Sequence, residues 1–146
     1  AARAGWIFKG HLSALDEFAP DWVAEAEKFA GAPYLWGGQV SLGADCSGLI
    51  QTALNAGGHD CPRDTDMQEG AVGESIVPAR DFSNLQRGDI VFWKGHVGVM
   101  IDGERLLHAN AFHMATAIEP LREAVDRILP VAGPITSVKR IAPKPL

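Results

Sequence analysis

The feature that most constrains the fold is a series of short apolar segments in the second half of the chain, separated by glycine-containing turns. These segments are residues 90–93, 96–101 and 105–109, with Lys94-Gly95 and Asp102-Gly103 between them. Short connections that contain glycine are typical of neighbouring antiparallel strands. The segments therefore predict an antiparallel meander, with residues 115–119 as one more strand and residues 136–141 as the last.

Helical spacing dominates the first half of the chain. One apolar stripe consists of Trp22, Val23, Ala26, Phe29 and Ala30, with Asp21 or Ser13 as its cap and with Gly31 and Pro33 at its end. A second stripe follows Cys46 and ends near residues 55–58, where two glycines favour a helix C-terminus. Shorter helices are expected around residues 66–70 and, between two prolines, at 121–129. Helices that precede an antiparallel sheet predict an α+β fold.

Residues 1–15 differ from the rest of the chain. Residues 5–8, Gly-Trp-Ile-Phe, predict a short strand, and a single strand needs partners. With the His-Leu pair that follows, this pattern resembles the last strand of a bacterial SH3-like domain. We therefore expect residues 1–15 to be the tail of an upstream SH3-like domain or a linker, and residues 16–146 to form the main domain. Because the chain begins with Ala rather than Met, we expect it to be a piece of a longer protein.

Length, charge and composition exclude several classes of protein. The chain has 146 residues, 47% of them hydrophobic, which is enough for one domain with a single core. No apolar run approaches the ~20 residues of a membrane span. The formal net charge of −5 argues against a nucleic-acid partner, because binding phosphates needs clustered Lys and Arg. The sequence also has no CxxC, HExxH or phosphate-binding glycine loop.

Cys46 lies where a loop enters a helix. It follows a glycine-rich stretch and precedes the second apolar stripe. The free N–H groups and partial positive charge of a helix N-terminus favour a thiolate over a thiol, so this position suits a nucleophile. The other cysteine, Cys61, lies in a loop before Pro62. Two cysteines are too few for a disulfide scaffold. A disulfide between them is the less favoured alternative, because Cys46 starts a helix and Cys61 lies in a loop.

His96 and His108 lie on neighbouring predicted strands and can work together only if they share a face of the sheet. Side chains alternate along a strand, so the length of the intervening loop decides. A two-residue turn at Asp102-Gly103 would place the two rings on opposite faces. A three-residue loop, residues 102–104, would pair Gly98 with His108 and make the two histidines diagonal neighbours, ~7–8 Å apart. The catalytic hypothesis therefore predicts the three-residue loop.

The strand that begins at His96 also predicts where the Cys46 helix packs. Val97, Val99 and Ile101 form one apolar face, while Gly98 shares the other face with His96. A glycine in a strand allows close approach by a neighbour. The Cys46 helix is the expected neighbour on this His96 face.

If Cys46, His96 and His108 meet, they have the residue types of a nucleophile, a base and an orienting group. His96 would take the thiol proton and form an ion pair with the thiolate, which attacks an amide carbon to give an acyl-enzyme. His108 would orient His96. The oxyanion would be bound by the Cys46 N–H and the Tyr34 hydroxyl. This chemistry needs no metal or organic cofactor.

Structural interpretations compete with the catalytic one. A cysteine at a helix start is often a small buried apolar residue, and a histidine in a strand is often structural. The aromatic ring of Trp36 is expected in the core. A zinc site made of Cys46, His96, His108 and His113 is a further alternative, but the spacing of these residues does not specifically support it.

Six short motifs follow one another along the chain. They are Pro33-Tyr34-Leu35-Trp36-Gly37-Gly38, Asp45-Cys46-Ser47-Gly48-Leu49, Pro62-Arg63-Asp64, Arg87-Gly88-Asp89-Ile90-Val91-Phe92, Gly95-His96-Val97-Gly98-Val99 and Leu107-His108-Ala109. In this order they resemble the NlpC-type cell-wall peptidases, which are papain-like cysteine peptidases of bacteria. The resemblance extends over residues 21–141.

The resemblance implies a fold and an activity. The fold would be a papain-like α+β core over residues 16–146, with the nucleophile helix packed on a central antiparallel sheet. The activity would be hydrolysis of peptidoglycan stem peptides, commonly at the bond between D-γ-glutamate and a diamino acid such as meso-diaminopimelate.

The resemblance also implies roles for particular residues. Cys46 matches the nucleophile, His96 the base and His108 the third polar residue, and neither a metal nor a cofactor is implied. Tyr34 matches a tyrosine near the oxyanion site. Around the groove, the residues expected to border substrate are Asp45, Ser47, Arg63 and Asp64, with a structural role in the loop as the alternative for each.

Three further expectations concern context. An upstream SH3-like domain would narrow the groove and select short peptides with a free N-terminal L-Ala. A murein substrate implies a periplasmic or secreted protein of the bacterial envelope, with cytoplasmic recycling of murein peptides as the alternative. The competing functions are a papain-like amidase or acyltransferase with the same triad and a non-catalytic cell-wall binding module.

Overall fold

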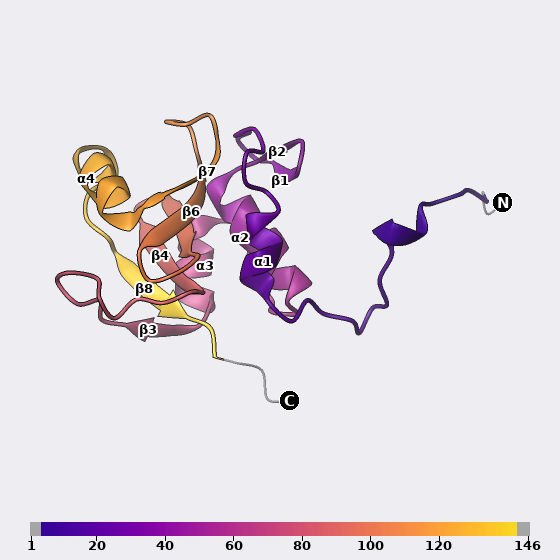
Figure 1. The fold of residues 1–146 in the computed structure, drawn as a ribbon, viewed down its shortest axis with the longest axis horizontal. Coiled ribbons are helices and arrows are strands. Elements are labelled where there is room, and N and C mark those ends of the chain that lie inside the picture. Colours follow the sequence, from indigo (N-terminus) through magenta and orange to yellow (C-terminus); the bar gives the residue numbers. More distant parts are fainter. Residues whose placement is uncertain (1–3, 143–146) are drawn as a thin grey trace.

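A six-stranded antiparallel sheet organises residues 4–142, the part of the chain that the computed structural model describes (Figure 1). Its strands, in spatial order, are β3 (Glu74–Ile76), β8 (Ser137–Arg140), β4 (Asp89–Trp93), β5 (His96–Met100), β6 (Arg105–Asn110) and β7 (Ala115–Pro120). The helices are α1 (Trp22–Glu27), α2 (Cys46–Ala56), α3 (Thr65–Ala71) and α4 (Leu121–Ala132). The predicted α+β class is confirmed; the small ribbon of β1 (Gln39–Val40) and β2 (Gly43–Ala44) and the edge strand β3 were not predicted.

Helices cover both faces of the sheet (Figure 1). On one face α1 and α2 pack against apolar side chains that include Val97, Val99 and Leu107. On the other face α4 packs against a second cluster that includes Met100 and Leu106. The prediction that the Cys46 helix lies on the His96 face is therefore wrong. Both faces of β5 are buried, so its alternation does not reveal which face α2 contacts.

The helix boundaries follow from capping residues. Asp21, not Ser13, caps α1, since its Oδ1 accepts hydrogen bonds from the backbone N–H groups of Val23 and Ala24. α2 begins at Cys46, as predicted, and its capping residue is Asp45. α4 continues through Pro130, which was expected to end it, and stops before Gly133. No helix within residues 4–142 has the length and apolar character required to cross a membrane.

The loop between β5 and β6 has the predicted three residues. Val99 pairs with Leu107, and the Ile101 N–H donates to the Arg105 carbonyl over 2.9 Å. This register places His108 opposite Gly98, two residues from His96. A Cβ added at Gly98 would lie 3.0 Å from the His108 Cβ. The close neighbour on this face is thus the β6 side chain rather than the Cys46 helix.

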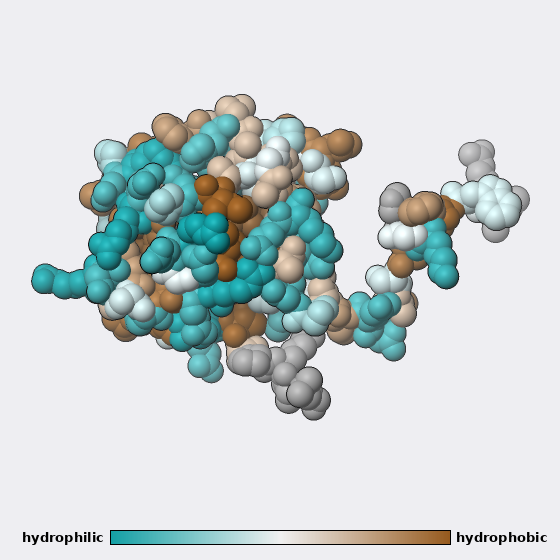
Figure 2. Space-filling view, viewed as in Figure 1, coloured by the Kyte–Doolittle hydropathy of each residue, from teal (hydrophilic) through white to brown (hydrophobic). Residues whose placement is uncertain are grey.

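The segment before α1 extends away from the body of the molecule (Figures 1 and 2). Residues 5–8 form no strand, and within the described residues they have no strand beside them to supply backbone hydrogen bonds. The side chain of Trp6 is fully exposed. The predicted strand is therefore absent, while the origin of this segment in an SH3-like domain stays a prediction. Residues 1–3 of the expected tail lie outside the described residues.

Candidate active site

The thiol of Cys46 lies at the start of α2, on the wall of a cavity of about 450 Å³. The side chain is 9% exposed. The residues that line the cavity are Trp36, Gly37, Asp45, Cys46, Ser47, Arg63, Asp64, Thr65, Asp66 and Gly95. Four of the predicted substrate residues, namely Asp45, Ser47, Arg63 and Asp64, therefore surround the predicted nucleophile.

Asp45 and Arg63 connect three segments around the thiol. Asp45 accepts hydrogen bonds from the backbone N–H groups of Gly48 and Gly37, each over 2.7 Å. Arg63 donates to the Asp45 carboxylate over 2.7 Å and to the Ser47 hydroxyl over 2.8 Å. Burial would raise the pKa of Asp45, but Arg63 and the two N–H groups hold this pKa below its ordinary value. The carboxylate is therefore ionised and largely bonded to the protein itself.

Two glycines allow the loop before α2 to rest directly on its first turn. A Cβ at Gly48 would lie 2.2 Å from the Gly38 carbonyl oxygen, and one at Gly38 would lie 2.3 Å from the Gly43 carbonyl oxygen. Gln68, fully buried on α3, connects this region to a second element, because its side-chain amide donates hydrogen bonds to the carbonyls of Ser47 and Pro62. The backbone around Cys46 is thus held from two sides.

His96 and His108 form a direct hydrogen bond between their rings. Nε2 of His96 lies 2.8 Å from Nδ1 of His108. His96 begins β5 and is partly exposed, whereas His108 is fully buried in β6. Because Nε2 of His96 is engaged by His108, Nδ1 is the ring nitrogen left to exchange a proton.

The network continues beyond His108 to two residues that the sequence reasoning missed. Nε2 of His108 lies 2.6 Å from Oε1 of Glu119 on β7, and Arg127 on α4 also donates to this oxygen. His108 pairs with Ala117, so Glu119 is its diagonal neighbour on the same face. The alternation of residues 105–120 is the signal that could have revealed Glu119.

Burial dominates the electrostatics of the thiol and the base. It raises the pKa of Cys46, although the Val97 N–H and the Thr65 hydroxyl, 4.0 Å from Sγ, act in the opposite direction. Burial and the positive charges that His108 and Arg127 can carry lower the pKa of His96 to about 3. These directions favour a neutral thiol and a neutral imidazole, not the predicted thiolate and ion pair. Within the described residues, the structure has no hydrogen bond between Cys46 and His96.

Two aromatic residues stand near the thiol in different settings. Tyr34 is partly buried, and its pKa is raised by burial and by the negative charges that Cys46 and Asp45 can carry. Trp36 was predicted to lie in the core, but it is 86% exposed on the rim of the cavity. Its ring is therefore available to a bound molecule.

Comparison with known proteins decides the family. The sequence profile described as the NlpC/P60 family matches residues 31–126, which include Cys46, His96 and His108. The chain belongs to the NlpC/P60 family. The predicted resemblance is thus confirmed.

Curated relatives of this NlpC/P60 chain carry peptidase names. It is 35% identical over 115 residues to the gamma-D-glutamyl-L-lysine dipeptidyl-peptidase of Bacillus subtilis, covering 73% of this chain and 37% of the relative. It is 34% identical over 100 residues to the bifunctional muramidase/DL-endopeptidase CwlT of the same organism, covering 60% of this chain and 28% of the relative. The chain therefore spans well under half the length of these relatives.

Solved structures of NlpC/P60 proteins have the same fold. The peptidoglycan hydrolase RipB of Mycobacterium tuberculosis aligns with a TM-score of 0.66 at 27% identity, over 82% of this chain and 62% of that chain. The NlpC/p60 domain of the peptidoglycan hydrolase SagA aligns with a TM-score of 0.65 at 28% identity, over 82% of this chain and 96% of that chain. The papain-like α+β arrangement predicted from the motifs is that of its structural relatives.

One cluster in this NlpC/P60 chain has the residue types of a metal site. Among the described residues, ligand atoms of His108, His113 and Glu119 all lie within 4.8 Å of one another. A cation there would have to displace Arg127 from the Glu119 carboxylate and break the hydrogen bond between Glu119 and His108. The arrangement fits a hydrogen-bonded network better than a metal site, and neither Cys46 nor His96 belongs to it.

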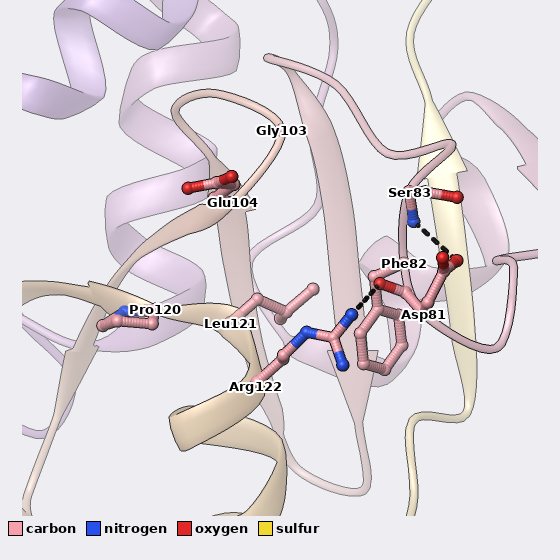
Figure 3. Close-up of a pocket in the computed structure, with 8 residues that line it drawn as sticks. All are labelled: Asp81, Phe82, Ser83, Gly103, Glu104, Pro120, Leu121 and Arg122. Carbon is pink, nitrogen blue, oxygen red and sulfur yellow. Dashed lines mark hydrogen bonds between the residues drawn. The ribbon is translucent and has the colours of Figure 1, made fainter.

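A second cavity, of about 550 Å³, lies where β7 meets α4 (Figure 3). Arg122 extends across it and donates to the backbone carbonyl of Asp81 over 2.6 Å. Its lining consists of Asp81, Phe82, Ser83, Gly103, Glu104, Pro120, Leu121 and Arg122. This lining has no cysteine, so the larger cavity lacks the thiol that lines the smaller one.

Proposed function

We propose that this chain is a cysteine peptidase that hydrolyses peptidoglycan stem peptides at the bond between D-γ-glutamate and a diamino acid. The observation that carries the proposal is the hydrogen-bonded pair of His96 and His108 at the start of β5, where the backbone N–H of the next residue, Val97, acts to lower the pKa of Cys46. A nucleophile next to a base that a third group orients is the signature of covalent catalysis. The peptidase names of the relatives support the substrate class.

In this mechanism, Nδ1 of His96 accepts the thiol proton as the sulfur attacks the amide carbon. The carbon–sulfur bond forms, and the carbonyl oxygen becomes an oxyanion. The backbone N–H of Cys46 and the Tyr34 hydroxyl are the proposed donors to this oxyanion. His96 then gives the proton to the leaving amine as the carbon–nitrogen bond breaks, which leaves an acyl-enzyme. Water, deprotonated by His96, releases the product acid and restores the thiol.

The proposed mechanism accommodates the neutral resting pair. A neutral His96 is already an acceptor at neutral pH, so proton transfer can accompany attack rather than precede it. Burial, which makes the free thiolate costly, also strengthens the interaction of the oxyanion with its donors. The thiol is therefore expected to react in the presence of bound substrate more readily than with small alkylating agents.

The cavity walls supply the proposed substrate contacts. Asp45 and Arg63 satisfy one another, so we assign them mainly to shaping the wall, together with the Ser47 hydroxyl. Asp64 is exposed on the rim, where its carboxylate can approach an ammonium group of the substrate. The diamino acid is meso-diaminopimelate in the first substrate to test.

The proposed setting is the bacterial cell envelope, since peptidoglycan is the proposed substrate. Recycling of murein peptides in the cytoplasm is the alternative setting. An upstream SH3-like domain that favours peptides with a free N-terminal L-Ala remains part of the proposal. If the full-length protein cleaves free and sugar-linked stem peptides equally well, this preference is wrong.

The decisive test is mass spectrometry of L-Ala-D-γ-Glu-meso-diaminopimelate incubated with the wild type, with Cys46→Ala and with the matched control Cys61→Ala. Release of L-Ala-D-Glu by the wild type and the control, but not by Cys46→Ala, is the expected result. Equal release by Cys46→Ala would overturn the nucleophile assignment. In a parallel digest of whole peptidoglycan by the full-length protein, cleavage between sugar and L-Ala would favour an amidase. Absence of all cleavage would favour an acyltransferase or a binding module.

A further inference from the structure

Four side chains form one continuous line across the sheet and onto α4. His96 on β5, His108 on β6 and Glu119 on β7 are successive diagonal neighbours, and Arg127 on α4 ends the line. The described contacts join them through a 2.8 Å ring-to-ring hydrogen bond, a 2.6 Å ring-to-carboxylate hydrogen bond and the ion pair of Glu119 with Arg127. The proposed reaction uses only the first two of these residues.

The positions of the protons along this line follow from Glu119. Burial would raise the pKa of the Glu119 carboxyl, but the hydrogen bond with His108 and the charge of Arg127 keep it below its ordinary value. The group is therefore a carboxylate, which can only accept. Nε2 of His108 must then donate to it.

The same argument determines the tautomers of His108 and of His96, the proposed base. Burial lowers the pKa of His108, and its ring is neutral with a single N–H. With that hydrogen on Nε2, Nδ1 of His108 is an acceptor and takes a hydrogen bond from Nε2 of His96. His96, which is also neutral, then has its lone pair on Nδ1. The carboxylate thus determines the tautomers of both rings.

Because Arg127 pairs with Glu119, the two histidines face an ion pair rather than a lone buried carboxylate. Its guanidinium offsets the Glu119 charge, opposes protonation of His96 and His108, and stacks 4.3 Å above the ring centroid of Phe112. His113, whose ring centroid lies 6.3 Å from that of His108, also acts to lower the pKa of His108. The pair of Glu119 and Arg127 can therefore orient the rings without charging them.

We propose that Glu119, held by Arg127, is a positioning residue that fixes His108 and His96 as Nε2–H tautomers and so keeps Nδ1 of His96 free to accept the thiol proton. This inference deepens the proposed function at the same site. Its core concerns proton positions, which are measurable whether or not the chain cleaves peptidoglycan.

The test is long-range ¹H–¹⁵N correlation NMR of the histidine-labelled protein, which distinguishes Nδ1–H from Nε2–H rings. The matched pair is Glu119→Gln, which keeps an accepting oxygen, and Glu119→Met, which has similar size and no such acceptor. In Glu119→Met the Arg127 donors face Nε2 of His108, so both rings are expected to shift towards Nδ1–H. Glu119→Gln and the exposed control Glu123→Gln are expected to keep the wild-type tautomers. An Nδ1–H His108 in the wild type, or unchanged tautomers in Glu119→Met, would overturn the proposal.

Kinetics supply a second readout. On the tripeptide, kcat of Glu119→Met should fall about 10- to 100-fold, as for other groups that orient a functional histidine, while KM stays within about twofold. Glu119→Gln should recover most of kcat. If the tripeptide is not cleaved at all, the proposed function fails while the tautomer measurement still decides this inference.

A second variant covers the case in which Glu119→Met does not fold. Arg127→Met removes the charge that offsets Glu119, so the pKa of His108 should rise and its ring should acquire a second N–H as pH falls. An NMR titration of His108 that gives the same midpoint as the wild type would contradict the proposed role of Arg127.

Discussion

The surroundings of the two cysteines differ in polarity rather than in exposure. Cys46 is 9% exposed and Cys61 8% exposed, and both are free thiols, as the sequence favoured. Burial alone raises the pKa of Cys61 to about 11. Around Cys46 the same burial is opposed by N–H and hydroxyl groups that face the sulfur. Polar groups that can stabilise a developing charge on sulfur therefore distinguish a candidate nucleophile better than its solvent exposure does.

The largest expected effect is the difference in kcat/KM between variants that lack one or the other cysteine. Cys46→Ala should lower kcat/KM on the tripeptide by roughly 10⁴-fold or more, because no nucleophile remains. Cys61→Ala should stay within about threefold of the wild type, since Cys61 is a residue of the buried apolar cluster and its thiol donates to the Pro62 carbonyl. A comparable loss in both variants would remove the functional difference between the cysteines.

A methyl group at Gly98 should affect the site that contains Cys46 and leave the surroundings of Cys61 unchanged. In Gly98→Ala the added Cβ would press on the side chains of His108 and Leu106. We expect kcat to fall roughly 10- to 100-fold and stability to fall by about 1–3 kcal/mol, the usual cost of overpacking. Steady-state kinetics and urea unfolding measure the two effects. Alkylation of Cys61 in the folded protein is the internal control and should not change.

The low pKa of His96 should make stability depend on pH. The pKa of His96 is about 3 in the folded protein and near 6.5 when unfolded. Between these values the unfolded state binds the extra proton, so stability falls as pH falls, by up to about 1.4 kcal/mol per pH unit for each such group. Urea unfolding at pH 6 and pH 5 should show this loss, and His96→Gln should reduce it. Equal slopes in the two proteins would contradict the low pKa.

The smallest expected effect concerns Thr65. Its hydroxyl lowers the pKa of Cys46, so Thr65→Val should raise that pKa and slow alkylation of Cys46 by iodoacetamide a few-fold at pH 8. Peptide mass spectrometry can follow both cysteines in one sample. The rate at Cys61 should be the same in both proteins, and a parallel slowing there would point to a general change in the fold instead.

Much of the site follows from alternation and loop length. The requirement that His96 and His108 share a face predicted the three-residue loop, and the register of β5 and β6 confirms that prediction. The same reasoning could have placed Glu119 beside His108, but it needed the pairing of β6 with β7. Alternation along a strand therefore predicts neighbouring side chains only for those strand pairs whose pairing is also considered.

Features set by tertiary packing could not be predicted in the same way. The face on which α2 packs was wrong because α4 covers the other side and leaves both faces of β5 buried. The expectation of a thiolate at Cys46 considered the helix N-terminus alone and left out burial, which raises the pKa of this thiol. Trp36 was placed in the core because its type is usually buried, whereas the path of the loop leaves it on the rim.

The line of hydrogen-bonded side chains from His96 to Arg127 connects the proposed base with α4. Glu119 immediately precedes Pro120 and Leu121, which line the larger cavity of Figure 3. A compound that lodged in this cavity and shifted the start of α4 would move Arg127 relative to Glu119. Such a compound would act as a remote inhibitor: it would leave the thiol open to substrate and impair the group that must take its proton.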